Sequence, residues 1–227
     1  MDMKKEVAKK IAEKAKSGEI IGLGTGSAAE AVIRALGERV KNEGLKIQGV
    51  STSEVSTQIA GEVGIPVLSL SKGVKLDWGF DGADEVDPKC VLIKGKGGAL
   101  LIEKIIAKSL PKYVIAVTED KLVNKLGEKC ALPIEVVPEA VSFVMKELEN
   151  LGASKVELRS GSNFFGPLFT EKGNRIIDAS FNDLDVALAE RIKAITGVVE
   201  HGLFYGFADL TVVCGKRNGQ VSEIKGF

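Results

Sequence analysis

The sequence predicts an α/β protein with a mostly parallel sheet in one domain and a smaller ferredoxin-like α+β domain. Over roughly the first hundred residues, short apolar runs alternate with segments of helical period, which is typical of a parallel sheet. From about Leu132 the order becomes strand, helix, two strands, helix, which indicates a ferredoxin-like unit. A chain of 227 residues has room for both. We expect the large domain to hold residues 1–130 and 205–227, and the small one residues 131–204.

The large domain is predicted to begin with an amphipathic helix over residues 4–16, because Val7, Ile11 and Ala15 recur at helical spacing opposite lysines. Apolar runs then predict buried strands, at residues 19–23, 46–50, 65–70, 78–80, 91–93 and 113–117. Helices are predicted between them, at residues 28–36, 54–63 and from about residue 99.

The small domain is predicted from the same two periods. Its strands are expected at residues 134–137, 153–159 and 175–179, and its helices at residues 138–150 and 183–194. A loop at 160–167 and a hairpin turn at 171–174 separate the second and third strands. The chain closes with a strand at 209–214, a turn at 216–219 and a last strand, which we expect to rejoin the first sheet.

The composition excludes several classes of function. Lysine plus arginine and aspartate plus glutamate both number 31, so no net charge draws the protein to nucleic acid or an anionic membrane. Three widely spaced cysteines match no metal-ligand pattern and fit a reducing compartment. The charged N-terminal run lacks an apolar signal core, and no later stretch is apolar for eighteen residues, so we expect a soluble, cytoplasmic protein. A single histidine, His201, offers little for a His-based triad or a histidine-rich zinc site, and it is interpreted as a structural or surface residue.

The loop 24–27 joins a predicted strand to a predicted helix, an arrangement that can bind an anion. Its match to G-x-G-x-x-A is the weak form of the dinucleotide fingerprint, and the next strand ends in Ser51-Thr52-Ser53 without the acid that holds a ribose. Hydroxyl groups suit a phosphate or a sugar better. The simpler interpretation is that glycine forms the turn and the hydroxyls cap the next helix.

Most of the predicted chemistry lies between residues 78 and 106. Asp81-Gly82-Ala83-Asp84 is predicted to form a tight turn, which puts two carboxylates at the tip of a strand. The loop 94–98 exposes backbone N–H groups that can approach an oxyanion. Glu103 follows one turn into a helix, on an apolar face with no lysine at helical spacing. Burial raises the pKa of such a carboxyl group, as a general base requires; the alternative is an ordinary surface glutamate.

Asp81, Asp84 and Asp87 raise the possibility of a metal site, but their spacing argues against one. A calcium loop carries its acids at alternate positions and closes with a distant glutamate, whereas these acids fall at every third residue. Pro88 indicates that Asp87 ends the turn. We predict turn capping and no metal.

Six segments, in order along nearly the whole chain, resemble the signatures of type A ribose-5-phosphate isomerases. They are GLGTGSAAE, STSEVST, FDGADEVDP, IKGKGGALLIEKI, LPIEVVPEA and TGVVEHGLF. The resemblance implies interconversion of ribose 5-phosphate and ribulose 5-phosphate through a cis-enediolate. It implies no metal and no cofactor, and a Rossmann-like domain that carries a ferredoxin-like one. It also implies a homodimer or homotetramer that binds a small pentose phosphate, and no nucleic acid or membrane.

The resemblance also assigns roles to residues. It makes Glu103 the base between C2 and C1, Asp81 a participant in ring opening, and Asp84 the residue that orients the reacting hydroxyls. It has Lys94 and the N–H groups of residues 95–97 stabilise the enediolate charge. The implied substrate-binding residues are Thr25, Gly26, Ser27, Ala28, Asp81, Gly82, Ala83, Asp84, Lys94, Gly95, Lys96, Gly97 and Lys121.

Lys121 corresponds to the family's phosphate-binding lysine, and Lys4 or Lys5 is a candidate to assist it. Two positions depart from the family's pattern: Ala28 stands where threonine is frequent, and Lys96 where a small residue or arginine is frequent. The change at Ala28 removes a hydroxyl contact with the substrate.

Two alternatives from other classes remain. A non-enzymatic sugar-phosphate sensor needs a DNA-reading module, but the first nineteen residues hold only one predicted helix. A coenzyme A transferase of related fold uses a covalent glutamate, and an amino-sugar-phosphate deaminase usually has a histidine near its acids. Turnover of ribose 5-phosphate alone separates these alternatives.

Overall fold

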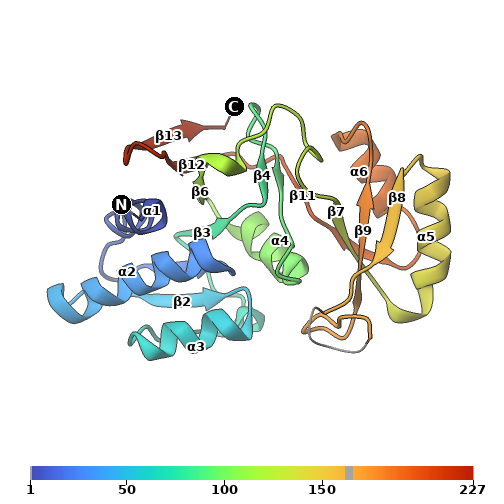
Figure 1. The fold of residues 1–227 in the computed structure, drawn as a ribbon. Helices are drawn as coiled ribbons and strands as arrows, with labels where there is room; N and C mark the ends of the chain where they lie inside the picture. Colours follow the sequence, from blue (N-terminus) through green and yellow to red (C-terminus); the bar gives the residue numbers. More distant parts are fainter. Residues whose placement is uncertain (1, 162–165, 227) are drawn as a thin grey trace. The chain divides into compact units, whose positions relative to one another are not determined.

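The computed structural model describes residues 2–161 and 166–226, which form two compact units (Figure 1). The first unit contains the chain up to residue 83, residues 102–121 and the chain from residue 206 onward; the second contains residues 84–101 and 122–205. These boundaries differ from the predicted ones at residues 84–101 and 122–130. Both segments belong to the second unit because Ile93, Val123 and Leu126 are part of its hydrophobic core. Residues 162–165 of the predicted loop 160–167 lie outside the described residues.

The first unit is built on a six-stranded sheet in the order β13-β12-β6-β3-β1-β2. Its strands are β1 (Ile20–Leu23), β2 (Gln48–Ser51), β3 (Trp78–Gly82), β6 (Tyr113–Thr118), β12 (Leu210–Gly215) and β13 (Val221–Lys225). All neighbours are parallel except the edge strand β13, which pairs antiparallel with β12. The prediction that the C-terminal strands rejoin the first sheet is therefore confirmed.

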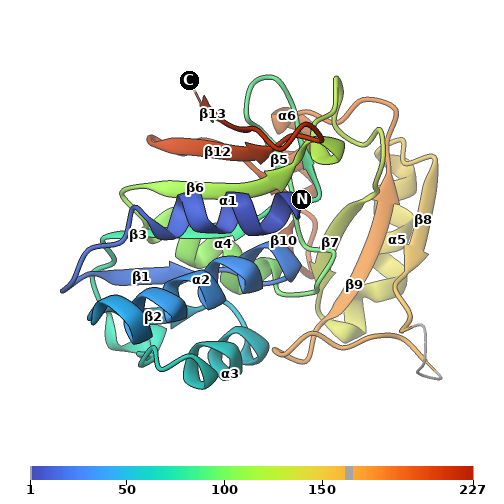
Figure 2. The same ribbon diagram turned by 60° about the vertical axis from the view of Figure 1, so that its left-hand side comes forward.

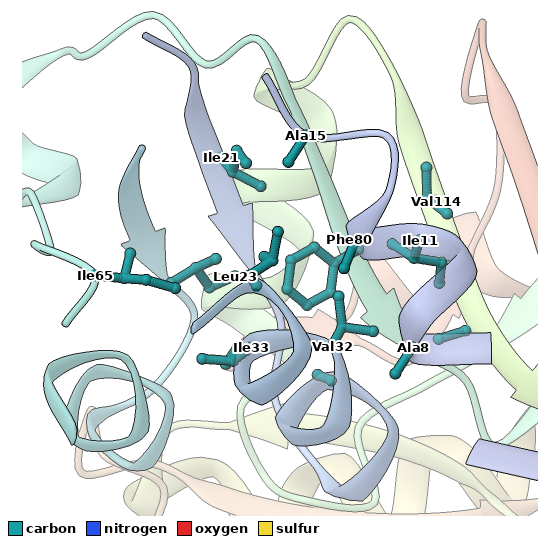
Figure 3. Packing of buried hydrophobic residues seen from close by; sticks show 14 of the residues in the cluster. Ala8, Ile11, Ala15, Ile21, Leu23, Val32, Ile33, Ile65, Phe80 and Val114 are labelled. Atoms are coloured by element: carbon teal, nitrogen blue, oxygen red, sulfur yellow. The ribbon is translucent and has the colours of Figure 1, made fainter. Parts of the chain in front are cut away.

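Helices cover both faces of this sheet (Figure 2). On one face lie α1 (Met3–Ala12), α2 (Ser27–Glu43) and α3 (Glu54–Glu62), whose apolar residues form one core with the sheet. Phe80 of β3 lies at the centre of that core beside Leu23 and Val32 (Figure 3). On the opposite face lies α4 (Leu100–Ser109), with Ile106 in a separate cluster beside Val50.

Two glycines allow α4 to approach the sheet closely. A Cβ on Gly22 would lie 2.9 Å from Cγ2 of Ile106, and a Cβ on Gly79 would lie 2.7 Å from Cδ1 of Leu110. Side chains at these positions would push the helix away, because neither contact leaves room for a carbon atom. The glycines therefore fix α4 over the middle of β1 and β3.

The second unit contains a four-stranded antiparallel sheet in the order β10-β7-β9-β8. Its elements are β7 (Leu132–Val136), α5 (Val141–Asn150), β8 (Lys155–Leu158), β9 (Arg175–Ser180), α6 (Val186–Lys193) and β10 (Val198–His201). This is the strand–helix–strand–strand–helix–strand order of a ferredoxin-like fold, so the predicted fold class is confirmed. A three-stranded sheet, β11-β5-β4, completes the unit, with β4 (Glu85–Val86), β5 (Leu92–Ile93) and β11 (Leu203–Phe204).

Several predicted elements differ from the structure. The strand predicted at 65–70 is wrong: the segment makes only an isolated bridge between Val67 and Gly49, and Pro66 has no N–H to extend the ladder. The turn predicted at Asp81 is also wrong at its start, because Asp81 and Gly82 continue β3 in register with β6. The first helix is shorter than predicted and α2 is longer. Strand β10 was not predicted.

His201 ends β10 and is buried rather than at the surface. Its Nδ1 accepts a hydrogen bond from the backbone N–H of Leu203 (3.2 Å). Among the residues that the structure describes, no helix combines the length and the apolar character needed to cross a membrane.

Candidate active site

Asp81 lies at the carboxyl end of β3 with its side chain buried. Its Oδ1 accepts hydrogen bonds from the N–H of Gly82 (2.7 Å) and from the N–H of Thr25 (3.1 Å). A Cβ on the neighbouring Gly24 would lie 2.4 Å from both Cγ and Oδ1 of Asp81. The carboxylate thus occupies the space that a side chain on β1 would otherwise take, and two backbone donors fix its orientation.

Glu103 lies in the first turn of α4 and is only 3% exposed, so its predicted burial is confirmed. Ile106, three residues later on the same helix face, packs over Gly22 of β1. The rise of α4 from Ile106 back to Glu103 is about 4.5 Å, which is similar to the length of about 6.6 Å from Gly22 to Gly24 along the neighbouring chain segment. Glu103 therefore lies over the end of the sheet where Asp81 fills the space beside Gly24. The next residue, Lys104, is also buried.

Tyr113 is a buried residue near these carboxylates that the sequence did not single out. It begins β6 opposite Gly79, so its side chain projects from the same sheet face as that of Asp81. The side chain is 3% exposed, and its hydroxyl group has no hydrogen-bond partner among the described residues. Burial raises the pKa of Tyr113 well above its ordinary value, and the negative charges of Asp81 and Glu103 raise it further. Both carboxylates therefore lie within electrostatic range of this hydroxyl group. The local sequence shows only an apolar strand here, and the pairing of β6 with β3, which brings Tyr113 onto this face, cannot be seen in it.

The hydroxyl of Thr25 joins a cluster of hydroxyl groups at the ends of β1 and β2. Its Oγ1 lies 2.6 Å from Oγ1 of Thr52 and donates to Oγ of Ser53 (2.7 Å). Thr52 and Ser53 are buried, and Ser53 caps α3 by accepting from the N–H of Ser56. These hydroxyls hold the loop in place, as the simpler interpretation predicted.

The start of α2 has the character of an anion site. Gly26 is its N-terminal cap, with φ +98° and no side-chain capping hydrogen bond, so the first N–H groups of a 17-residue helix lack a side-chain cap. Gly26 and Ser27 are exposed, and Nζ of Lys4 donates to Oγ of Ser27 (2.9 Å). Lys5 is exposed and shows no such contact with the loop.

The N-terminus of α2 lies beside the carboxyl end of β3, next to β6, at one edge of the sheet. A Cβ on Gly82 would lie 3.6 Å from Cβ of Ala28 and 3.9 Å from the carbonyl oxygen of Ala116. Lys121 follows β6 in a short 3₁₀ turn, with Nζ 3.9 Å from Oδ2 of Asp120 and its side chain 38% exposed. A phosphate at this edge could therefore reach both the helix N-terminus and a cation on the loop after β6.

The second unit holds the other predicted group. Lys94 is buried after β5, with Nζ 5.4 Å from the ring centre of Phe204, and its N–H donates to the carbonyl of Gly202 (2.9 Å). The N–H of Lys96 donates to Oδ2 of Asp84 (3.1 Å), so Asp84 holds the loop directly. Gly97 is exposed, and its N–H has no partner among the described residues.

The predicted site residues thus fall into two groups. The first unit holds Thr25, Gly26, Ser27, Ala28, Asp81, Gly82, Ala83, Glu103 and Lys121. The second unit holds Asp84, Lys94, Gly95, Lys96 and Gly97. Asp87 caps a turn, as predicted, by accepting from the N–H groups of Lys89 (2.9 Å) and Val91 (2.8 Å). Within the described ranges, no three or more His, Cys, Asp or Glu residues are grouped so that they could hold a metal ion.

Comparison with known proteins gives consistent results. Residues 48–219 match the family model for ribose 5-phosphate isomerase A (phosphoriboisomerase A). Ribose-5-phosphate isomerase A from Methanothermobacter thermautotrophicus is 43% identical over 221 residues, which is 96% of each chain. The Pyrococcus abyssi protein of the same name is 43% identical over 225 residues, 98% of each chain.

Solved structures of such enzymes are also similar over the whole chain. The ribose 5-phosphate isomerase A of Methanocaldococcus jannaschii aligns with a TM-score of 0.93 and 40% identity, covering 99% of this chain and 98% of that one. A D-ribose-5-phosphate isomerase in complex with phospho-erythronic acid aligns with a TM-score of 0.94 and 41% identity, at the same coverage. From these matches, over nearly the whole chain, this chain belongs to the ribose 5-phosphate isomerase A family.

Proposed function

We propose that this chain interconverts ribose 5-phosphate and ribulose 5-phosphate by moving a proton between C1 and C2 of the open-chain sugar. The observation that carries the proposal is the presence of two buried carboxylates, Asp81 at the end of β3 and Glu103 in the first turn of α4, in a chain of this family. Removing a proton from carbon next to a carbonyl group requires a positioned base, and it leaves negative charge on oxygen. A related isomerase binds phospho-erythronic acid, a phosphorylated sugar acid, which fits a substrate of this class.

Glu103 is the base in this proposal. It takes the proton from C2 of ribose 5-phosphate, which gives a cis-enediolate. The hydroxyl proton on O2 moves to O1, and Glu103 returns its proton to C1 to give ribulose 5-phosphate. Its burial keeps the carboxyl group out of water, in a fixed position, as a base that must accept and release a proton requires. Its place in the first turn of α4 lets the helix dipole stabilise its charged form before the first transfer and after the second.

Asp81 binds the sugar oxygens and takes part in ring opening. Its Oδ1 is occupied by the N–H groups of Thr25 and Gly82, so its orientation is set before the substrate arrives. Asp84 orients the reacting hydroxyls while it holds the N–H of Lys96. Lys94 and the N–H of Gly97 stabilise the charge that develops on the enediolate oxygens. The roles of Asp84, Lys94 and Gly97 rest on the family's motifs.

The phosphate binds at the N-terminus of α2. Support comes from the missing side-chain cap at Gly26 and the exposed Ser27. The contact between Lys4 and Ser27 favours Lys4 over Lys5 as the assisting lysine. Lys121 adds a second cation from the loop after β6. Ala28 contributes its backbone N–H and no hydroxyl contact.

We also propose that the protein is a homodimer or homotetramer in the cytoplasm, and that it needs no cofactor. The oligomer rests on the family resemblance and is tested by light scattering after size-exclusion chromatography. The compartment is supported by the free, buried thiols of Cys90 and Cys214, which suit reducing conditions.

The reaction is tested with the purified protein and ribose 5-phosphate alone, before and after exhaustive dialysis against a chelator. We expect ribulose 5-phosphate to form at the same rate in both samples. Binding without turnover would indicate a sensor. A requirement for an acyl coenzyme A would indicate a transferase, and a requirement for an amino-sugar phosphate would indicate a deaminase. Activity that chelation removes and a divalent ion restores would refute the proton-transfer scheme and favour a metal-assisted hydride shift.

A further inference from the structure

We infer that Arg159, at the end of β8, is a positioning residue that holds the loop 94–98 in its active geometry. The inference rests on the role proposed above for this loop in binding the enediolate. Its own basis is a set of hydrogen bonds within the second unit. One nitrogen of the guanidinium group, Nη1, donates to the carbonyl of Gly95 (2.9 Å) and to the carbonyl of Lys96 (3.0 Å).

The rest of the guanidinium group is fixed from the sheet. Nε of Arg159 donates to Oδ2 of Asp178 (2.7 Å), and Nη2 donates to Oδ1 of the same carboxylate. Both side chains are mostly buried, with 16% and 25% of their surface exposed. A bidentate arginine–carboxylate pair has one defined orientation, so Nη1 is aimed at the loop by the sheet and not by the loop itself.

The carbonyl contacts determine where the loop's N–H groups point. In a planar trans peptide the C=O and the N–H point in opposite directions. The carbonyl of Gly95 shares a peptide with the N–H of Lys96, which donates to Asp84. The carbonyl of Lys96 shares a peptide with the exposed N–H of Gly97. Arg159 thus turns the Gly97 N–H away from the sheet, toward a ligand.

The loop cannot hold this shape through its own chemistry. Gly95 and Gly98 have φ of +107° and +78°, values that glycine adopts freely and also leaves freely. Within the loop, the N–H of Gly98 donates a hydrogen bond to the carbonyl of Gly95 (3.0 Å). Gly95 also packs against Pro133 of β7, where a Cβ would lie 3.4 Å away. Together with the hydrogen bond from Lys96 to Asp84, Arg159 supplies the directional contacts that packing does not.

The decisive variant is Arg159→Lys, because lysine has a single nitrogen in place of the three that Arg159 uses, so it cannot face Asp178 and both carbonyls from the same positions. The matched control is Arg175→Lys. Arg175 belongs to the adjacent strand β9, and its Nη1 donates to the carbonyl of Pro167 (2.9 Å) without touching the loop. Circular dichroism verifies the fold of both. If Arg159→Lys does not fold, Asp178→Asn replaces it, because it keeps Arg159 in place and weakens its anchor.

Two measurements are made on these proteins. Hydrogen exchange of the peptide amides in residues 94–98 reports anchoring, and steady-state kinetics with ribose 5-phosphate report function. We expect faster exchange in Arg159→Lys and a kcat lower by ~10- to 100-fold with a smaller change in KM, because the loop acts on charge that develops in the transition state. Asp178→Asn shifts both quantities in the same direction, and Arg175→Lys shifts neither.

Each failure has a distinct meaning. Unchanged exchange in Arg159→Lys overturns the anchoring. Faster exchange with a kcat within about twofold of wild type overturns the role of the loop in catalysis, and with it this inference. Faster exchange together with a lower kcat in the Arg175→Lys control as well would show a general effect on the sheet, and would also overturn the inference. None of these outcomes alters the test of the overall reaction, which uses the wild-type protein.

Discussion

Gly24 is a position where one added carbon atom tests how the carboxylates are arranged. In Gly24→Ala the new Cβ would lie 2.4 Å from Cγ of Asp81 and 2.6 Å from its Cα. A rotamer change of Asp81 cannot relieve the overlap, because Cα is part of the backbone. We expect the free energy of unfolding to fall by ~1–3 kcal/mol, the usual cost of overpacking a core. We also expect kcat to fall by ~10- to 100-fold, because an ångström of displacement disturbs the hydrogen bond from Thr25.

Urea denaturation followed by circular dichroism gives the change in stability, and steady-state kinetics give kcat. Gly61→Ala is the matched control. Gly61 lies in α3, and a Cβ there would meet no atom within 4 Å. Alanine at this site should raise the free energy of unfolding by ~0.5–1 kcal/mol through helix propensity and leave kcat unchanged. A Gly24→Ala protein as stable and as active as wild type would refute the close packing of Gly24 on Asp81.

Three further predictions concern single side chains. Lys121→Ala should raise KM more than it lowers kcat, because phosphate contacts are largely shared by ground and transition states; an unchanged KM removes Lys121 from the site. Tyr113→Phe should lose less stability than wild type as the pH rises from about 9 to 11. Because the pKa of Tyr113 is higher in the folded protein than in the unfolded chain, its contribution to stability is complete below the pKa of the unfolded chain and is lost as the pH rises toward the pKa in the folded protein. Curves of unfolding free energy against pH that run parallel for the two proteins would contradict the burial of Tyr113. Burial raises the pKa of Cys90 and of Cys214, so both should react slowly with a thiol reagent until urea is added; rapid labelling of either in the folded protein would be inconsistent with the structure.

Much of the fold could be predicted because local pattern and tertiary structure agree. Strands β1, β2, β3 and β6 are apolar runs between glycine or polar turns, and each falls within a few residues of its predicted range. Glu103 could be found because three-residue spacing placed it with Ile106 on one face of α4. The ferredoxin-like order followed from the elements themselves, although β10 lacks alternating polarity and was missed.

The remaining features depend on contacts between residues far apart in sequence. Pro66 ends the pairing of a segment that has an apolar strand pattern, because it supplies no N–H. Tyr113 shares a sheet face with Asp81 only through the register of β6 beside β3. Arg159 reaches the loop 94–98 from more than sixty residues away, a contact that no local pattern indicates. The hydroxyls of Thr52 and Ser53 suited a sugar by composition, but the structure uses them to hold Thr25.

The central claim is that Glu103 is the base, and Glu103→Gln tests it most directly because the amide keeps the size of the side chain and removes its basicity. The measurement is kcat with ribose 5-phosphate, on a protein whose fold is verified by circular dichroism and whose binding is verified with phospho-erythronic acid. Glu38→Gln, an exposed glutamate on α2, is the control and should retain full activity. We predict that Glu103→Gln binds normally and loses kcat by a factor on the order of 10²–10⁴, the usual contribution of a positioned base. A folded Glu103→Gln protein that keeps more than about a tenth of wild-type kcat would contradict the assignment and make Asp81 the next candidate.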